Sequence, residues 1–141
     1  MYLDSAYIAK YYVNERDSNA VRALIQRAGS LISSAWALAE VACVFHRHMR
    51  EGSLSPSQCR ALGLAFLEHV EQGVWDLIPV TESLMKRTAS LVIAAPHETY
   101  LRAGDAVHLI TARDLGEHEI WTNDRHLLRA APHFGLVGRS A

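Results

Sequence analysis

The sequence has few cysteines, no long apolar run and no excess of basic residues. Cys43 and Cys59 are its only two cysteines and form no CxxC motif, which argues against a disulfide framework or a zinc ribbon. No stretch approaches the roughly 18 apolar residues of a membrane span, and no basic and apolar leader opens the chain. We therefore expect no membrane partner and a cytoplasmic location. A formal net charge of -1 is not typical of proteins that bind nucleic acid, because such proteins usually carry an excess of basic residues.

Several common catalytic motifs are also missing. The chain contains no GxSxG, P-loop or GxGxxG sequence, so acyl transfer and nucleotide-binding folds have no motif in their favour. His46 and His48 are two residues apart in a predicted helix and face different directions, which makes shared metal binding improbable. What the chain does have is an ordinary globular composition, 50% hydrophobic and 21% charged, and 141 residues, enough for one domain over residues 1–141 with its own core.

Short apolar segments alternate with longer segments of helical period. The pattern predicts strands at 1–3, 30–33, 75–80, 119–122 and 136–137, and helices at 5–13, 18–28, 36–50, 56–72, 81–95 and 125–131, with a further helix opening at 101–112. Pro79 indicates that the third strand lies at an edge of the sheet or that the strand ends near this residue. Strands that alternate with helices predict an α/β fold, a parallel sheet with helices on both faces.

Four acidic residues stand at positions that need a reason. Asp4 follows the first strand, Asp124 follows the fourth, Asp105 lies in the segment LRAGDAVHLITA, and Glu40 lies off the apolar stripe of its helix. Taken singly, each aspartate could cap a helix and Glu40 could be solvated. The carboxyl ends of parallel strands and the starts of the following helices share one edge, so together these acids are expected to converge.

Converging carboxylates require a counter-charge. Two of them about 4 Å apart repel by roughly 4 kcal/mol at an effective dielectric near 20, and a divalent cation removes that cost. An all-oxygen ligand set favours Mg²⁺ or Mn²⁺, and such a site suits hydrolysis of phosphodiesters. We expect Asp4 and Asp105 to be the principal ligands, with Glu40 and Asp124 completing the site directly or through water. Glu40 could also orient the attacking water. His108 shares the face of Asp105, where a supporting or packing role is favoured over direct chemistry.

Four segments carry a resemblance to a known family. YLDSAYIAKYYVNE, AWALAEVACVF, LRAGDAVHLITA and WTNDRHLLRAA are similar, in that order, to the characteristic segments of the PIN-domain family and specifically of the VapC-type toxins. These segments contain the four acids and Thr122. The similarity spans essentially the whole chain, and four ordered segments are far more specific than any one of them.

The resemblance implies a PIN-like three-layer α/β/α sandwich and an Mg²⁺- or Mn²⁺-dependent endoribonuclease. It also implies a homodimer and inhibition by a small antitoxin protein. Carried over by position, Asp4, Glu40, Asp105 and Asp124 form the acidic site, with Ser5 and Thr122 as supporting hydroxyls. Ala6 departs from the family, which often has a second hydroxyl there.

Three questions stay open at the level of sequence. Arg102 and Arg125 could contact RNA phosphate or could simply be solvated. The same acids could serve a metal-dependent phosphohydrolase or a DNA nuclease. A chain of this kind could also be a non-catalytic PIN-like module for binding or dimerisation.

Overall fold

The computed structural model describes all residues from 1 to 141 and is built around a five-stranded parallel sheet. The strands follow the order β3-β2-β1-β4-β5 and are paired in parallel throughout. Their bounds are β1 Tyr2–Leu3, β2 Ile32–Ser34, β3 Asp76–Ile78, β4 Glu119–Trp121 and β5 Val137–Arg139. The predicted α/β class is confirmed, and β3, the strand before Pro79, lies at an edge as expected.

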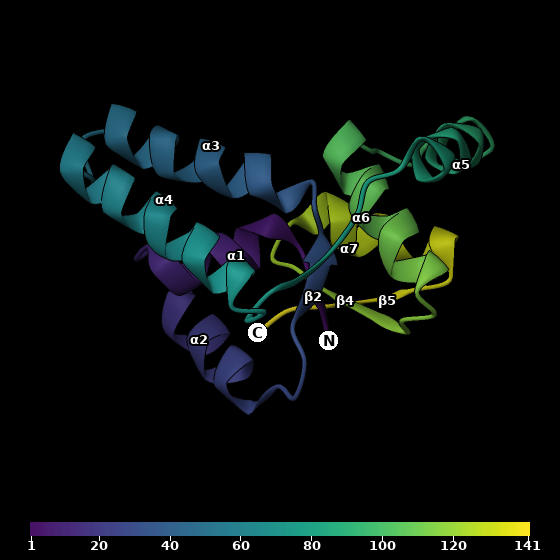
Figure 1. Cartoon of the computed structure of the whole chain (residues 1–141). Coiled ribbons are helices and arrows are strands. Elements are labelled where there is room, and N and C mark those ends of the chain that lie inside the picture. Colours follow the sequence, from purple (N-terminus) through teal and green to yellow (C-terminus); the bar gives the residue numbers. More distant parts are fainter.

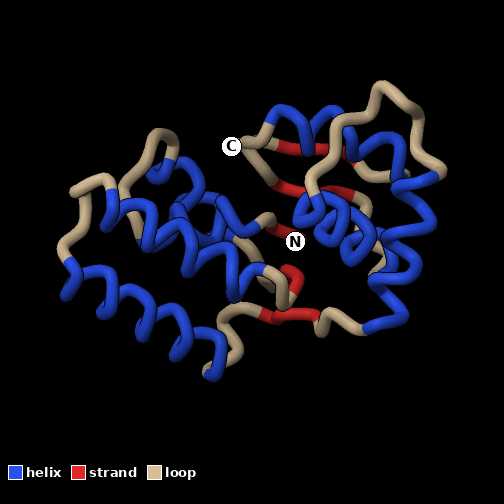
Figure 2. Tube along the Cα trace, turned by 90° about the horizontal axis from the view of Figure 1, so that it is seen from above, coloured by secondary structure: helices blue, strands red, loops and turns tan.

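Seven helices cover the two faces of this sheet. They are α1 Ser5–Tyr12, α2 Ser18–Arg27, α3 Ala37–Arg50, α4 Pro56–Glu71, α5 Glu82–Ile93, α6 Ala103–Asp114 and α7 Arg125–Ala130. Figure 1 shows α1 to α4 gathered on one side of the strands and α5 to α7 on the other, and Figure 2 shows the same division from above. None of the helices combines the length and apolar character that a membrane span requires.

Each face of the sheet has its own hydrophobic core. Successive side chains of a strand point to opposite faces, so in β1 Leu3 belongs to the core under α1 to α4, whereas Tyr2 belongs to the core under α5 to α7. The first core contains Phe45 and Phe66, and the second contains Leu109 and Ile120. Both cores meet at the central strand β1, which ends directly before Asp4.

Helix ends follow the capping signals of the sequence. Ser55 caps α4 in a capping box with Gln58, and Thr81 caps α5. The helix predicted at 125–131 is present as α7, which ends at Ala130. The chain then continues into a 3-10 turn, Ala131–Phe134, that includes Pro132.

Helix α6 is enclosed by the rest of the protein. Every residue from Asp105 to Ala112 is buried. The helix packs against α5, against strands β2 and β4, and against the turn at Ala131–Phe134. Because it is enclosed on several sides, its polar side chains must find partners inside the protein.

Candidate active site

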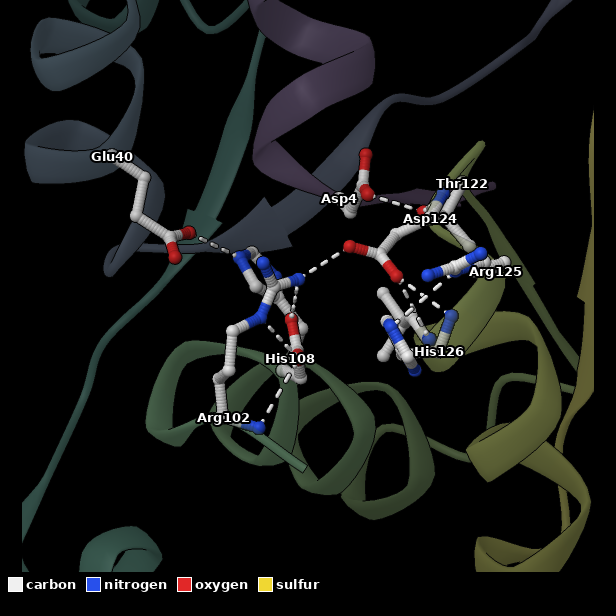
Figure 3. A network of polar contacts seen from close by, with 10 residues as sticks. Asp4, Glu40, Arg102, His108, Thr122, Asp124, Arg125 and His126 are labelled. Carbon is white, nitrogen blue, oxygen red and sulfur yellow. Dashed lines mark hydrogen bonds and ion pairs between the residues drawn. The ribbon is translucent and has the colours of Figure 1, made fainter. Parts of the chain in front are cut away.

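The four predicted acids line one cavity of about 560 Å³. They arrive there from separate segments of the chain: Asp4 directly follows β1, Glu40 lies in the first turn of α3, Asp105 lies in the first turn of α6, and Asp124 follows β4 and caps α7. Figure 3 shows how these segments surround the site. Arg102 also lines the cavity.

Asp4 is the most buried of the four acids, with 6% of its surface exposed. Its Oδ1 accepts a hydrogen bond from the backbone N–H of Tyr7 at 2.9 Å, so it does cap α1. Its Oδ2 accepts a hydrogen bond from the hydroxyl of Thr122. Burial raises the pKa of Asp4 from 3.8 to about 6, although both hydrogen bonds lower it. The cost of burial exceeds the stabilisation that these neutral donors provide.

Asp105 and Asp124 share the guanidinium of Arg102. Arg102 Nε lies 2.8 Å from Asp105 Oδ2, and Nη2 lies 3.0 Å from Asp105 Oδ1. The same Nη2 donates to Asp124 Oδ2 (Figure 3). The guanidinium thus bridges the two acids. The hydrogen bonds to Asp105 raise the pKa of Arg102 further above its ordinary value, so the guanidinium stays positively charged. Arg102 was a candidate for RNA contact, and here its charge is turned toward the acids of its own cavity.

Asp124 is also held by backbone. Its Oδ1 accepts from the N–H of His126 at 2.7 Å, and its own N–H donates to the Thr122 hydroxyl at 2.9 Å. Burial alone would raise the pKa of Asp124, but the His126 N–H and Arg102 outweigh burial and hold it below its ordinary value. The Thr122 hydroxyl therefore connects Asp4 with Asp124.

Glu40 faces His108 across the cavity. Glu40 Oε2 lies 2.9 Å from His108 Nε2, and His108 Nδ1 lies 3.1 Å from the hydroxyl of Tyr2. Burial alone would raise the pKa of Glu40, but the hydrogen bond and charge of His108 outweigh it, so the net pKa lies below the ordinary value. Ser5 and Ala6 line the same cavity. Tyr2 and Gly104 were not foreseen as parts of this site, and only the folded chain brings them to it.

The residues present suit a hard divalent cation by their chemistry, since all four acids offer carboxylate oxygen. The structure nevertheless contains no group of three or more His, Cys, Asp or Glu side chains arranged to hold a metal ion. The four acids thus share one cavity, as expected, but they are not arranged as a cluster that could hold a metal ion. A guanidinium already bridges Asp105 and Asp124, and it offsets the repulsion that was expected to require a cation.

Comparisons with known proteins place this chain in a family. A family model described as PIN domain matches residues 1–132. The chain belongs to the PIN domain family. It is 33% identical over 139 residues to Ribonuclease VapC46 of Mycobacterium tuberculosis (strain ATCC 25618 / H37Rv), a match that covers 97% of this chain and 94% of that protein.

A solved structure supports the fold. The crystal structure of Mycobacterium tuberculosis VapC20, described as a toxin that cleaves the sarcin-ricin loop, matches with a TM-score of 0.71 at 14% identity, over 92% of this chain and 93% of that chain. A shorter match is 40% identical to the cytochrome c biogenesis ATP-binding export protein CcmA of Roseobacter denitrificans, over 63% of this chain and 42% of that protein. Since this chain has no P-loop, that partial match gives no argument for ATP binding.

Proposed function

We propose that this chain is a metal-dependent endoribonuclease and the toxin of a toxin-antitoxin pair. The observation that carries the proposal is the common cavity of Asp4, Glu40, Asp105 and Asp124 in a chain of the PIN domain family. The full-length similarity to a protein named as a ribonuclease directs the proposal to RNA. The substrate class is thus the RNA phosphodiester.

The four acids would hold Mg²⁺ or Mn²⁺, with Asp4 and Asp105 as the principal ligands. When bound, a divalent cation lowers the pKa of a water molecule and stabilises the charge that develops on phosphate. Glu40 orients the attacking water with its carboxylate. Thr122 keeps Asp4 in place through its hydroxyl and meets the backbone of Asp124, as described above.

The remaining polar residues of the site have proposed roles at its border. Ser5 lines the cavity and adds a hydroxyl next to Asp4. Arg125, directly after Asp124, and Arg102, whose side chain is 54% exposed, would contact RNA phosphate. For Arg102 this contact competes with the two ion pairs that it forms inside the cavity.

The proposal extends to partners and place. We propose that the chain is a single domain that forms a homodimer, acts in the cytoplasm and is inhibited by a small antitoxin protein. Sedimentation of the purified chain measures whether it forms a dimer. Co-purification with the product of a small neighbouring reading frame, together with loss of cleavage in that complex, tests inhibition by an antitoxin.

The experiment that tests the activity is cleavage of a broad pool of structured RNA by purified, antitoxin-free protein with Mg²⁺, with Mn²⁺ or with EDTA. Asp4→Asn and Asp105→Asn remove one charge each, and Asp76→Asn, at an exposed position of β3, is the matched control. We expect cleavage that requires metal and is lost only in the first two variants. Cleavage of DNA or small phosphoesters in place of RNA would indicate a different hydrolase, and RNA binding without cleavage would indicate a binding module.

A further inference from the structure

Among the four acids, Glu40 is held in a different way. Asp4, Asp105 and Asp124 each accept a hydrogen bond from a backbone N–H, those of Tyr7, Arg102 and His126. Glu40 has no backbone donor. Its carboxylate depends on His108 at 2.9 Å, with a lesser contribution from the hydroxyl of Ser5. A long side chain without a backbone anchor has several rotatable bonds to restrain, so its orientation depends on that partner.

His108 is well placed to provide this restraint. Its side chain is 3% exposed, and it lies on the buried helix α6 between strand β1 and helix α3. One ring nitrogen meets Glu40, and the other meets the hydroxyl of the fully buried Tyr2. The contact Tyr2–His108–Glu40 therefore ties the central strand to the catalytic face of α3. We call these three residues the Tyr2 relay.

The hydrogen positions in the Tyr2 relay follow from its chemistry. An ionised carboxylate only accepts hydrogen bonds, so Nε2 of His108 carries a hydrogen and donates it to Glu40. A neutral ring then has an unprotonated Nδ1, which accepts from the Tyr2 hydroxyl. A protonated ring also donates from Nε2. In both states Nε2 donates the hydrogen bond to Glu40.

The opposite side of the Glu40 carboxylate is closed by packing. A Cβ atom added to Gly104 would lie 2.3 Å from Glu40 Oε1 and 3.1 Å from Trp36 Nε1. Only a residue without a side chain lets the first turn of α6 approach Glu40 this closely. Glu40 is thus confined between His108 on one oxygen and the backbone of Gly104 on the other.

We infer that His108, oriented by Tyr2, is a positioning residue that fixes the carboxylate of Glu40 for RNA cleavage. This inference rests on the proposed function. Groups that orient a catalytic or metal-binding side chain typically contribute 10- to 100-fold to affinity or activity. His108 is therefore assigned the role of orienting Glu40 in addition to its packing in the protein interior.

The central test combines variants of Glu40 and His108. We expect His108→Leu to lower kcat for RNA cleavage by about 10- to 100-fold, with KM changed less than about threefold. The same substitution in a Glu40→Gln background should have little further effect, because its target is already gone. His108→Gln, which keeps an N–H donor at the end of the side chain, should restore much of the loss. Thermal unfolding verifies that each variant is folded.

Two readouts do not depend on cleavage. In metal-free protein, the ¹⁵N spectrum of the histidine rings should place a hydrogen on Nε2 of His108. Tyr2→Phe removes the hydroxyl and keeps the ring, and it should weaken this signature and lower kcat several-fold. Mn²⁺ titration should show Glu40→Gln and His108→Leu weakening affinity to a similar degree.

The chain offers a matched control in a second histidine and tyrosine pair. His69 Nδ1 lies 2.8 Å from the hydroxyl of Tyr12, away from the cavity. His69→Leu should leave cleavage and Mn²⁺ affinity unchanged.

The outcomes separate this inference from the proposed function. Wild-type cleavage and Mn²⁺ affinity in Glu40→Gln would overturn the proposed site, and the inference with it. Loss in Glu40→Gln with wild-type behaviour in folded His108→Leu would overturn only the inference. Equal losses in His108→Gln and His108→Leu, or a hydrogen on Nδ1 alone, would also overturn it.

Discussion

The two halves of the acidic cavity solve the problem of buried negative charge differently. Asp105 and Asp124 share the guanidinium of Arg102, which offsets their charge. Asp4 is tied only to neutral donors, Thr122 and the N–H of Tyr7, and its pKa is raised to about 6 by burial. One half of the cavity is therefore electrostatically satisfied within the chain, and the other is not.

This difference indicates what a divalent cation would meet on entering the cavity. On the side of Asp4 it would relieve an uncompensated carboxylate, which is favourable. On the side of Asp105 and Asp124 it would compete with a cation that already makes three hydrogen bonds to their side chains. Metal affinity is then the balance of these two effects, and each half can be altered separately.

The largest expected effect comes from removing the unsatisfied charge. Asp4→Asn keeps an oxygen to accept from Tyr7 and an amide to meet Thr122, so the fold should persist. We expect RNA cleavage to fall by about 1,000-fold or more, beyond the 10- to 100-fold typical of supporting residues. The rise in melting temperature that Mn²⁺ causes should disappear as well. If Asp4→Asn keeps that rise, as the control Asp76→Asn should, the two halves have been assigned wrongly.

The second effect concerns pH and the metal-free protein. A carboxyl whose folded pKa is raised from 3.8 to about 6 stabilises the fold below pH 3.8, and this stabilisation is lost as pH rises through about 6. The difference between the two values is worth about 3 kcal/mol. Asparagine resembles the protonated acid at every pH.

We therefore expect Asp4→Asn and wild type to unfold alike in urea and EDTA near pH 4. Near pH 7 the variant should be more stable, by up to about 3 kcal/mol. Glu40 and Asp124 have lowered pKa values and contribute the opposite slope, but they are present in both proteins, so the difference isolates Asp4. Parallel curves over this range would show that the burial of Asp4 is already compensated.

The third effect concerns the half of the cavity in which Arg102 offsets the charges of Asp105 and Asp124. Arg102→Gln removes the guanidinium that bridges Asp105 and Asp124, so we expect Mn²⁺ to bind about tenfold more tightly, a gain of about 1.4 kcal/mol. Calorimetric titration without RNA measures this separately from any role in substrate binding. Arg113→Gln, at an exposed position of α6, is the control. Unchanged or weaker Mn²⁺ binding in Arg102→Gln would show that the arginine does not compete with metal.

The sequence predicts much of this arrangement because strand ends and helix caps are local signals. Asp4 and Asp124 were placed at the carboxyl edge of the sheet from their positions after apolar segments, and each also caps the following helix. Capping a helix and lining the acidic cavity, which are alternatives in the sequence, thus occur in the same carboxylates. In each of them one oxygen caps the helix and the other accepts from a side chain, Thr122 for Asp4 and Arg102 for Asp124.

Features that depend on packing between distant segments could not be predicted this way. Arg102 looked like a solvated residue or an RNA contact, because nothing local reveals that Asp124 lies within its reach. Tyr2 looked like an ordinary strand residue, and its hydroxyl meets His108 only because α6 covers that face of β1. The enclosure of α6 on both faces likewise arises from its neighbours and not from its own periodicity.

The smallest expected effect tests close packing around Glu40 with a pair of glycines. Both lie in helices, where alanine normally stabilises by about 0.5–1 kcal/mol. A Cβ at Gly63 meets nothing within 4 Å, whereas a Cβ at Gly104 would collide with Glu40 Oε1. That oxygen ends a flexible side chain, so the carboxylate would move while the backbone of α6 stays in place.

Gly104→Ala should therefore change the free energy of unfolding by less than about 1 kcal/mol and still lower RNA cleavage about fivefold. Gly63→Ala should stabilise the protein without changing cleavage. Urea unfolding and cleavage rates measured on both variants separate fold from site. Full activity in Gly104→Ala would mean that Glu40 tolerates displacement, and the difference between the anchored aspartates and the confined glutamate would then have no consequence for cleavage.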